Sequence, residues 1–170
     1  MENKIMWLLS PNLRIGILDS LEKLADKELQ LTKWMNSNRK YTFWNQLMFC
    51  INALFNDANA LGKTSQIKVG LTVYNEEEVE KINKFCKFFD NLCNEEIGGQ
   101  ESDIAYFGHP QWQRVIEDAA ELVEEMERNN IANNFDECLS QFNHFDMEEY
   151  EDYDDFADAE NIKNGYNLWN

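Results

Sequence analysis

The chain has 170 residues, of which 44% are hydrophobic and 13% aromatic, so it can bury a core of the size that one domain requires. Its formal net charge at pH 7 is −17, from 32 acidic and 15 basic side chains. A charge of this sign repels nucleic acid and anionic lipid, whose phosphates need lysine and arginine, and it attracts basic proteins. We therefore expect no direct binding to nucleic acid or to a membrane.

The N-terminal residues lack the basic stretch followed by an apolar one that is typical of a secretory signal. No apolar run approaches the roughly 18 residues that a membrane span requires. The cysteines, Cys50, Cys86, Cys93 and Cys138, lie in apolar helical contexts without CxxC spacing, which predicts reduced thiols in the core. Together these features predict a cytoplasmic protein.

Two helices are predicted in the first third of the chain. Ser10-Pro11 is a typical helix start, and apolar residues follow it mostly at three- and four-residue steps, which predicts a helix from residue 11 to about 36. From Thr42 to Phe55, large apolar side chains recur at the same helical spacing. We expect the second helix to pack a face rich in aromatic rings.

The middle of the chain is predicted to contain one extended segment and one helix. Residues 67–74 alternate apolar and polar side chains, which indicates an extended segment or a short strand. Asn75 with Glu78 three residues later forms the pattern of a capping box, and it precedes a continuous apolar helical face that reaches Cys93.

Two further helices are predicted beyond residue 108. His109-Pro110 begins the first of them, which has an apolar inner face and a strongly acidic outer face. A shorter helix from about Asn134 to Asn143 is expected to bury its apolar side chains. The pattern as a whole predicts an all-α, single-domain bundle of five or six helices with at most one short strand or extended segment. We expect residues 1–144 to form this helical domain and residues 145–170 to form an acidic and aromatic C-terminal extension.

The most unusual part of the sequence is residues 145–160, which contain nine carboxylates, no basic residue and several aromatic rings. Tyr150, Tyr153 and Phe156 are three residues apart, so one helical side would present all three among acids. Two interpretations remain open: the rings contact a partner, or they pack on the protein's own core and leave the acids in water. The predicted partner-binding residues of this segment are Asp146, Glu148, Glu149, Tyr150, Glu151, Asp152, Tyr153, Asp154, Asp155 and Phe156. A second predicted surface consists of Glu117, Glu121, Glu124 and Glu125.

No motif predicts a cofactor, a metal ion or a catalytic residue. Gly62-Lys63-Thr64 resembles the end of a phosphate-binding loop, but Asp57 stands where that motif needs a glycine. The histidines and cysteines lack the spacing of metal ligands, and no nucleophile occurs in a recognisable catalytic context. We therefore expect the protein not to be an enzyme.

Four stretches, residues 13–35, 43–57, 69–82 and 102–126, resemble an uncharacterised family of small proteins that is common in actinobacteria. The most specific elements of the resemblance are the HPxWxxV step at His109, Pro110, Trp112 and Val115, and the residues Val69, Gly70, Glu77, Glu78 and Val79. Relatives of this kind look like immunity proteins of polymorphic-toxin and contact-dependent inhibition systems. The resemblance implies that the protein binds and neutralises a co-encoded toxin, and it supplies no catalytic residues.

The charge pattern and the resemblance together predict an immunity protein that binds a basic toxin domain. A nuclease, and in particular an RNase, is the favoured toxin, because ordered carboxylates can occupy a basic cleft in place of a nucleic acid. The alternative is an acidic regulatory or nucleic-acid-mimic protein that titrates a basic host protein. A toxin gene directly upstream would distinguish the first class from the second. The pattern indicates no particular oligomeric state.

Overall fold

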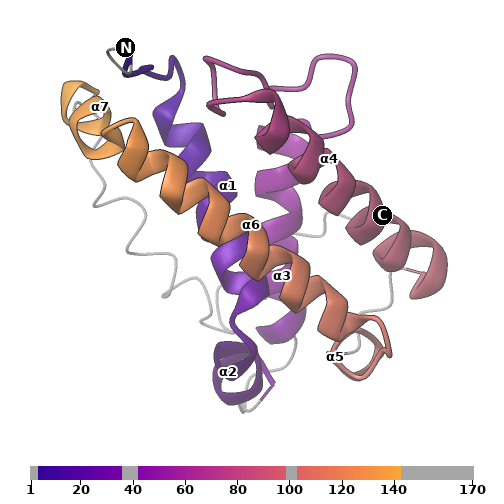
Figure 1. The fold of residues 1–170 in the computed structure, drawn as a ribbon. Helices are drawn as coiled ribbons and strands as arrows, with labels where there is room; N and C mark the ends of the chain where they lie inside the picture. The colour runs from indigo at the N-terminus through magenta and orange to yellow at the C-terminus, as the bar shows by residue number, and fades with distance from the viewer. Residues whose placement is uncertain (1–3, 36–41, 99–102, 143–170) are drawn as a thin grey trace, which may run out of the picture.

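The structure is a computed structural model that describes residues 4–35, 42–98 and 103–142 (Figure 1). In these ranges the protein is all-α and forms a single domain, as predicted, with seven α-helices and no strand. Three of the helices continue into a π-helical segment. The elements are α1 (Pro11–Ala25), α2 (Lys27–Leu29) with η1 (Gln30–Trp34), α3 (Thr42–Ile51) with η2 (Asn52–Asp57), α4 (Glu76–Asn91) with η3 (Leu92–Glu96), α5 (Asp103–Phe107), α6 (Trp112–Ala132) and α7 (Phe135–Gln141).

Helix α6 is the centre of the arrangement and runs diagonally across α1, with α4 beside it and α3 behind (Figure 1). The core between these helices is rich in rings. The Trp112 ring at the start of α6 has its centroid 5.9 Å from that of Phe43, 6.1 Å from that of Tyr106 and 6.3 Å from that of Phe89. A second, smaller cluster at the α7 end of the molecule includes Leu8, Tyr74, Phe135 and Cys138.

The predicted first helix is interrupted rather than continuous to residue 36. At Asp26 the backbone leaves the helical conformation, and the Asp26 carboxylate accepts the Leu29 N–H at 2.8 Å, which starts α2. The buried Gln30 amide then donates to the carbonyls of Lys23 and Leu24, which are left free at the end of α1. A side-chain cap at each side of the break therefore stabilises it.

Residues 67–74 form a compact loop in place of the predicted extended segment. The Lys68 carbonyl accepts the N–H groups of both Leu71 and Thr72, and Gly70 adopts a φ of 81°, which favours glycine. The β-type pairing in this loop is limited to one isolated bridge between Val69 and Val73. The loop pairs within the fold, because Leu9 and Ser10 donate their N–H groups to its Gly70 and Leu71 carbonyls.

Helices α4, α6 and α7 lie close to their predicted positions. Asn75 caps α4 by accepting the Glu78 N–H at 2.9 Å, but the reciprocal half of the predicted capping box is absent because the Glu78 carboxylate binds elsewhere. Helix α7 buries Phe135 and Cys138, as predicted. Phe142, which was expected to be buried, is 38% exposed because α7 ends one residue before it.

The four cysteines are free and buried, as predicted. Burial raises the pKa of Cys50, Cys86 and Cys93 to about 12, so these thiols stay protonated at neutral pH. Within the part of the chain that the structure describes, no helix combines the length and the apolar character needed to cross a membrane.

Candidate functional site

Three of the four residues of the second predicted surface are exposed on α6, and their role in binding stays a prediction. Glu117, Glu121 and Glu124 are exposed on one side of the helix, at positions i, i+4 and i+7, and we call these three residues the α6 acidic face. A rise of about 1.5 Å per residue spreads them over roughly 10 Å of the helix axis. The Gln113 amide donates to Glu117 at 3.1 Å, and the Arg128 guanidinium lies 3.9 Å from Glu124.

Glu125 is not part of this surface. Its side chain is buried, with 8% of its area exposed, and it forms an ion pair and hydrogen bond with Lys81 of α4. Lys81 also binds Glu77 of its own helix at 2.8 Å, and its pair with Glu125 joins α4 to α6. The sequence pattern placed Glu125 outside because helical periodicity on α6 alone does not show where α4 packs.

The predicted binding residues between Asp146 and Phe156 lie outside the described residues, as does the rest of the C-terminal extension. That they bind a partner therefore stays a prediction, and both interpretations of their rings stay open.

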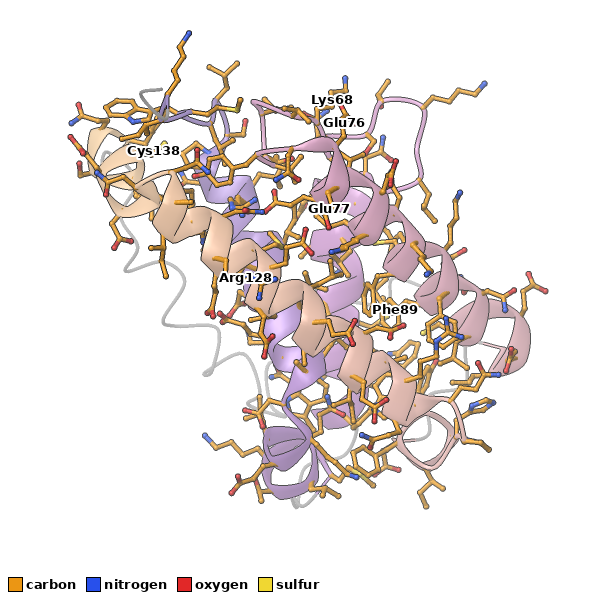
Figure 2. All side chains as sticks on the ribbon, in the orientation of Figure 1. Lys68, Glu76, Glu77, Phe89, Arg128 and Cys138 are labelled. Atoms are coloured by element: carbon orange, nitrogen blue, oxygen red, sulfur yellow. The ribbon has the colours of Figure 1, made fainter. Side chains whose placement is uncertain are left out.

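A mixed-charge groove of about 390 Å³ separates α4 from α6. Its acidic and basic residues largely pair with one another: Arg114 with Asp118 at 3.3 Å, for example, and Lys81 with Glu125. Arg128 of α6 lines this groove, and Glu77 of α4 lies nearby (Figure 2). Hydrogen bonding to Lys81, the attraction of the Lys81 charge and then that of Arg128 lower the pKa of Glu77. Four basic and four acidic side chains line this groove, and the acidic ones include Glu121 and Glu124 of the α6 acidic face, so the groove as a whole lacks a strong preference for a ligand of either sign.

A buried network around Arg14 holds α6 in place. Arg14 and Glu78 are both fully buried and form a bidentate ion pair, with N–O distances of 2.9 and 2.8 Å. The remaining Arg14 N–H groups donate to the Thr72 carbonyl, the Met126 carbonyl and the Asn130 amide oxygen. All five donors of the guanidinium therefore have an acceptor.

The other half of the Arg14 network is also complete. The Glu78 carboxylate accepts the Tyr74 N–H at 2.8 Å and the Asn129 side-chain amide at 2.9 Å. The network thus connects α1, the 67–74 loop, α4 and α6, and it leaves no Arg14 donor free for a ligand. We interpret it as a structural element that fixes the orientation of the α6 acidic face.

Tyr74 contributes a buried hydroxyl that has no hydrogen-bond partner among the described residues. Burial, more than the charges around it, raises the pKa of this hydroxyl to about 12. Since an unsatisfied buried hydroxyl is unfavourable, Tyr74→Phe is expected to raise the free energy of unfolding by about 1 kcal/mol. Urea denaturation would measure the change, and a clear loss of stability would contradict this interpretation of the hydroxyl.

The HPxWxxV step has a structural explanation. The His109 Nδ1 atom accepts the Gln111 N–H at 3.1 Å, which shapes the turn before α6. The Trp112 indole N–H donates to the buried Gln30 side chain at 2.9 Å, and Val115 is fully buried. These residues anchor the start of α6 to the break after α1.

Three carboxylates interact where α1 meets α6. Partial burial raises the pKa of Glu22, and the negative charges of Asp19 and Glu127 raise it further. Lys23, which forms a 3.1 Å ion pair with Asp19, acts in the opposite direction. This cluster therefore concentrates negative charge at some cost to the folded state.

Removing one charge from the Glu22 cluster should stabilise the protein. The folded state holds the Glu22 proton more tightly than the unfolded chain, so stability falls as pH rises from about 4.5 through the raised pKa, and the full penalty is present above that pKa. Glu22→Gln is expected to raise the urea midpoint at pH 7 and to leave it nearly unchanged at pH 3. As a control, Glu80→Gln, which removes an exposed charge from α4, should shift the urea midpoint little at either pH. A lower midpoint for Glu22→Gln at pH 7 would contradict the prediction.

Among the described residues, no group of histidines, cysteines or carboxylates has the arrangement of a metal site. The geometry is thus that of a rigid helical body with acidic surfaces.

Searches of curated proteins and of solved structures found no match to the chain. Residues 8–134 match the family described as a domain of unknown function (DUF7945), and this range includes all four stretches that carry the resemblance noted above. The chain belongs to this DUF7945 family.

Proposed function

We propose that the protein is a cytoplasmic immunity protein that binds a co-encoded basic toxin domain, a nuclease and in particular an RNase, and neutralises it by occluding its substrate-binding or active-site surface. The observation that carries the proposal is the distribution of acidic side chains. The α6 acidic face projects from the longest helix described, and the sequence adds nine carboxylates in residues 145–160. An RNase cleft lined by lysine and arginine offers charges complementary to such surfaces.

The anchoring of α6 supports this function. Arg14 binds the Met126 carbonyl, and Glu78 binds Asn129, so two fully buried side chains hold the second half of the helix. Residues presented by a fixed helix lose little conformational freedom on binding, which favours tight association. A surface of this kind suits an inhibitor that must bind its target before the target meets RNA.

The described residues favour binding over catalysis. The buried thiols of Cys50, Cys86 and Cys93 are protonated, the Arg14–Glu78 pair is closed to solvent, and His109 is engaged in the turn before α6. None of these groups is at once reactive and accessible to a substrate.

Co-purification tests the proposal most simply. A tagged form of the full chain is expressed together with the product of the neighbouring gene, and the eluate is examined for a stoichiometric complex. We expect the complex to form at low salt and to weaken as the salt concentration rises, because charge attraction contributes to it. Absence of a complex at every salt concentration would overturn the proposal, and binding to an unrelated basic host protein instead would favour the titration alternative.

A further inference from the structure

A second groove lies where α6 and α7 meet α1, and its volume is about 430 Å³. Leu18, Ile131 and Phe135 provide apolar lining, Glu127 and Asp136 provide acidic lining, and two asparagines complete it. We call this the α1–α6–α7 groove. Its three elements are packed against one another, so the groove belongs to the rigid part of the fold.

Ile131 gives this groove an apolar anchor. Its side chain is 83% exposed, more than any other large apolar side chain that the structure describes. It lies four residues after Glu127 on α6, which places an apolar and a negatively charged side chain next to each other. With Leu18 and Phe135 it forms the apolar part of the groove lining, beside the acidic Glu127 and Asp136.

The acids of this groove lack the internal pairing of the α4–α6 groove. Within the described ranges, Glu127, Asp136 and the adjacent Glu22 form no ion pair with a lysine, arginine or histidine. Arg14, which lies beneath them, donates every N–H group to other acceptors. The groove therefore presents negative charge that a cation from another molecule can neutralise.

We propose that the α1–α6–α7 groove binds an arginine or lysine side chain from a basic segment of a partner protein. The aliphatic stem of that side chain covers Leu18 and Ile131, and its cationic end approaches Glu127 and Asp136. The inference deepens the proposed function and rests on it for the identity of the partner, a basic toxin domain.

Charge opposes two alternative occupants, the acidic residues 145–160 and a second copy of the chain. The chain's own residues 145–160 carry nine carboxylates and no basic residue, so they share the sign of the groove. A second copy of the chain brings a net charge of −17, which opposes self-association at an acidic surface. A basic segment of a different protein satisfies both the apolar and the acidic lining.

A peptide titration of the full chain tests the groove without the toxin. The probe is a synthetic peptide in which arginine and leucine alternate, and its binding is followed by amide chemical shifts at low salt. We expect the largest shifts in α6 after Glu127 and at the start of α7. Glu127→Gln and Ile131→Ser are each expected to raise the peptide Kd about fivefold.

Matched substitutions on other helices serve as controls. Ile104→Ser on α5 removes an isoleucine that is 70% exposed, and Glu80→Gln removes an exposed charge from α4. Both should leave the peptide Kd within about twofold of the unmodified protein. Equal weakening by Ile104→Ser and Ile131→Ser, or shifts centred on the α4–α6 groove, would overturn the assignment.

The same variants separate this inference from the proposed function. In a complex with the toxin domain, Ile131→Ser should raise the Kd, whereas Ile104→Ser should not. A toxin complex that tolerates both Ile131→Ser and Glu127→Gln would overturn the groove and leave the immunity function standing. Absence of any toxin complex would overturn the immunity function. The peptide titration would still show whether the α1–α6–α7 groove binds a basic segment.

Discussion

Replacing Arg14 with methionine is expected to lower the free energy of unfolding by about 3–5 kcal/mol, because it leaves the Glu78 carboxylate buried without its cation. The change also removes the donors that satisfy the Thr72 and Met126 carbonyls. Urea denaturation followed by circular dichroism measures the loss. A destabilisation of this size would identify the network as the element that holds α1, α4 and α6 together.

A matched arginine on the surface provides the control for this prediction. Arg128 is 68% exposed and forms a 3.9 Å pair with Glu124, so Arg128→Met should cost no more than about 1 kcal/mol. The double variant Arg14→Met with Glu78→Met should lose less than the sum of the two single variants, because it removes both buried charges. Equal costs for Arg14→Met and Arg128→Met would contradict the role assigned to the network.

Charge reversal of the α6 acidic face is expected to slow association with the toxin domain by about tenfold at low salt. The variant carries lysine in place of Glu117, Glu121 and Glu124, which are exposed and outside the core. The effect should shrink as the salt concentration rises, since screening weakens long-range attraction. Stopped-flow measurement of the association rate at several salt concentrations tests it.

Two further triple variants change the net charge by the same amount. Lysine at Glu28, Glu80 and Glu95, which are exposed on other elements, should slow association much less. Lysine at Asp152, Asp154 and Asp155 tests the acidic C-terminal segment, which the sequence predicts to be a contact. If all three variants slow association equally, net charge and not a particular surface governs the encounter. If none does, neither predicted surface guides binding.

Local patterns in the sequence predicted most of the helices. The Asn75 cap, the His109-Pro110 step and the three- and four-residue spacing of apolar side chains depend on neighbours in the sequence, and they placed α4, α6 and α7 closely. The break at Asp26 was missed because an aspartate within a helical pattern is an ordinary surface residue until its carboxylate caps the next turn. The 67–74 loop was missed because alternation does not distinguish a strand from a loop that returns on itself.

The interactions that position the candidate site could not be predicted from spacing. Glu78 meets Arg14 across 64 positions of the sequence, and Lys81 meets Glu125 across 44. A partial signal for the first was present, because Arg14 lies three residues before the buried Ile17 on the apolar side of α1. An arginine on a buried face requires a carboxylate partner, but the sequence does not say which one.

The most direct measurement of the central claim is an RNA cleavage assay with the product of the neighbouring gene, which the proposal identifies as the toxin domain. RNA is incubated with the toxin domain alone, and then with increasing amounts of the protein. The account predicts that RNA remains intact once the protein reaches a one-to-one molar ratio with the toxin domain, and that lysine at Glu117, Glu121 and Glu124 weakens this protection. RNA that is degraded at the same rate with and without excess protein would contradict the account.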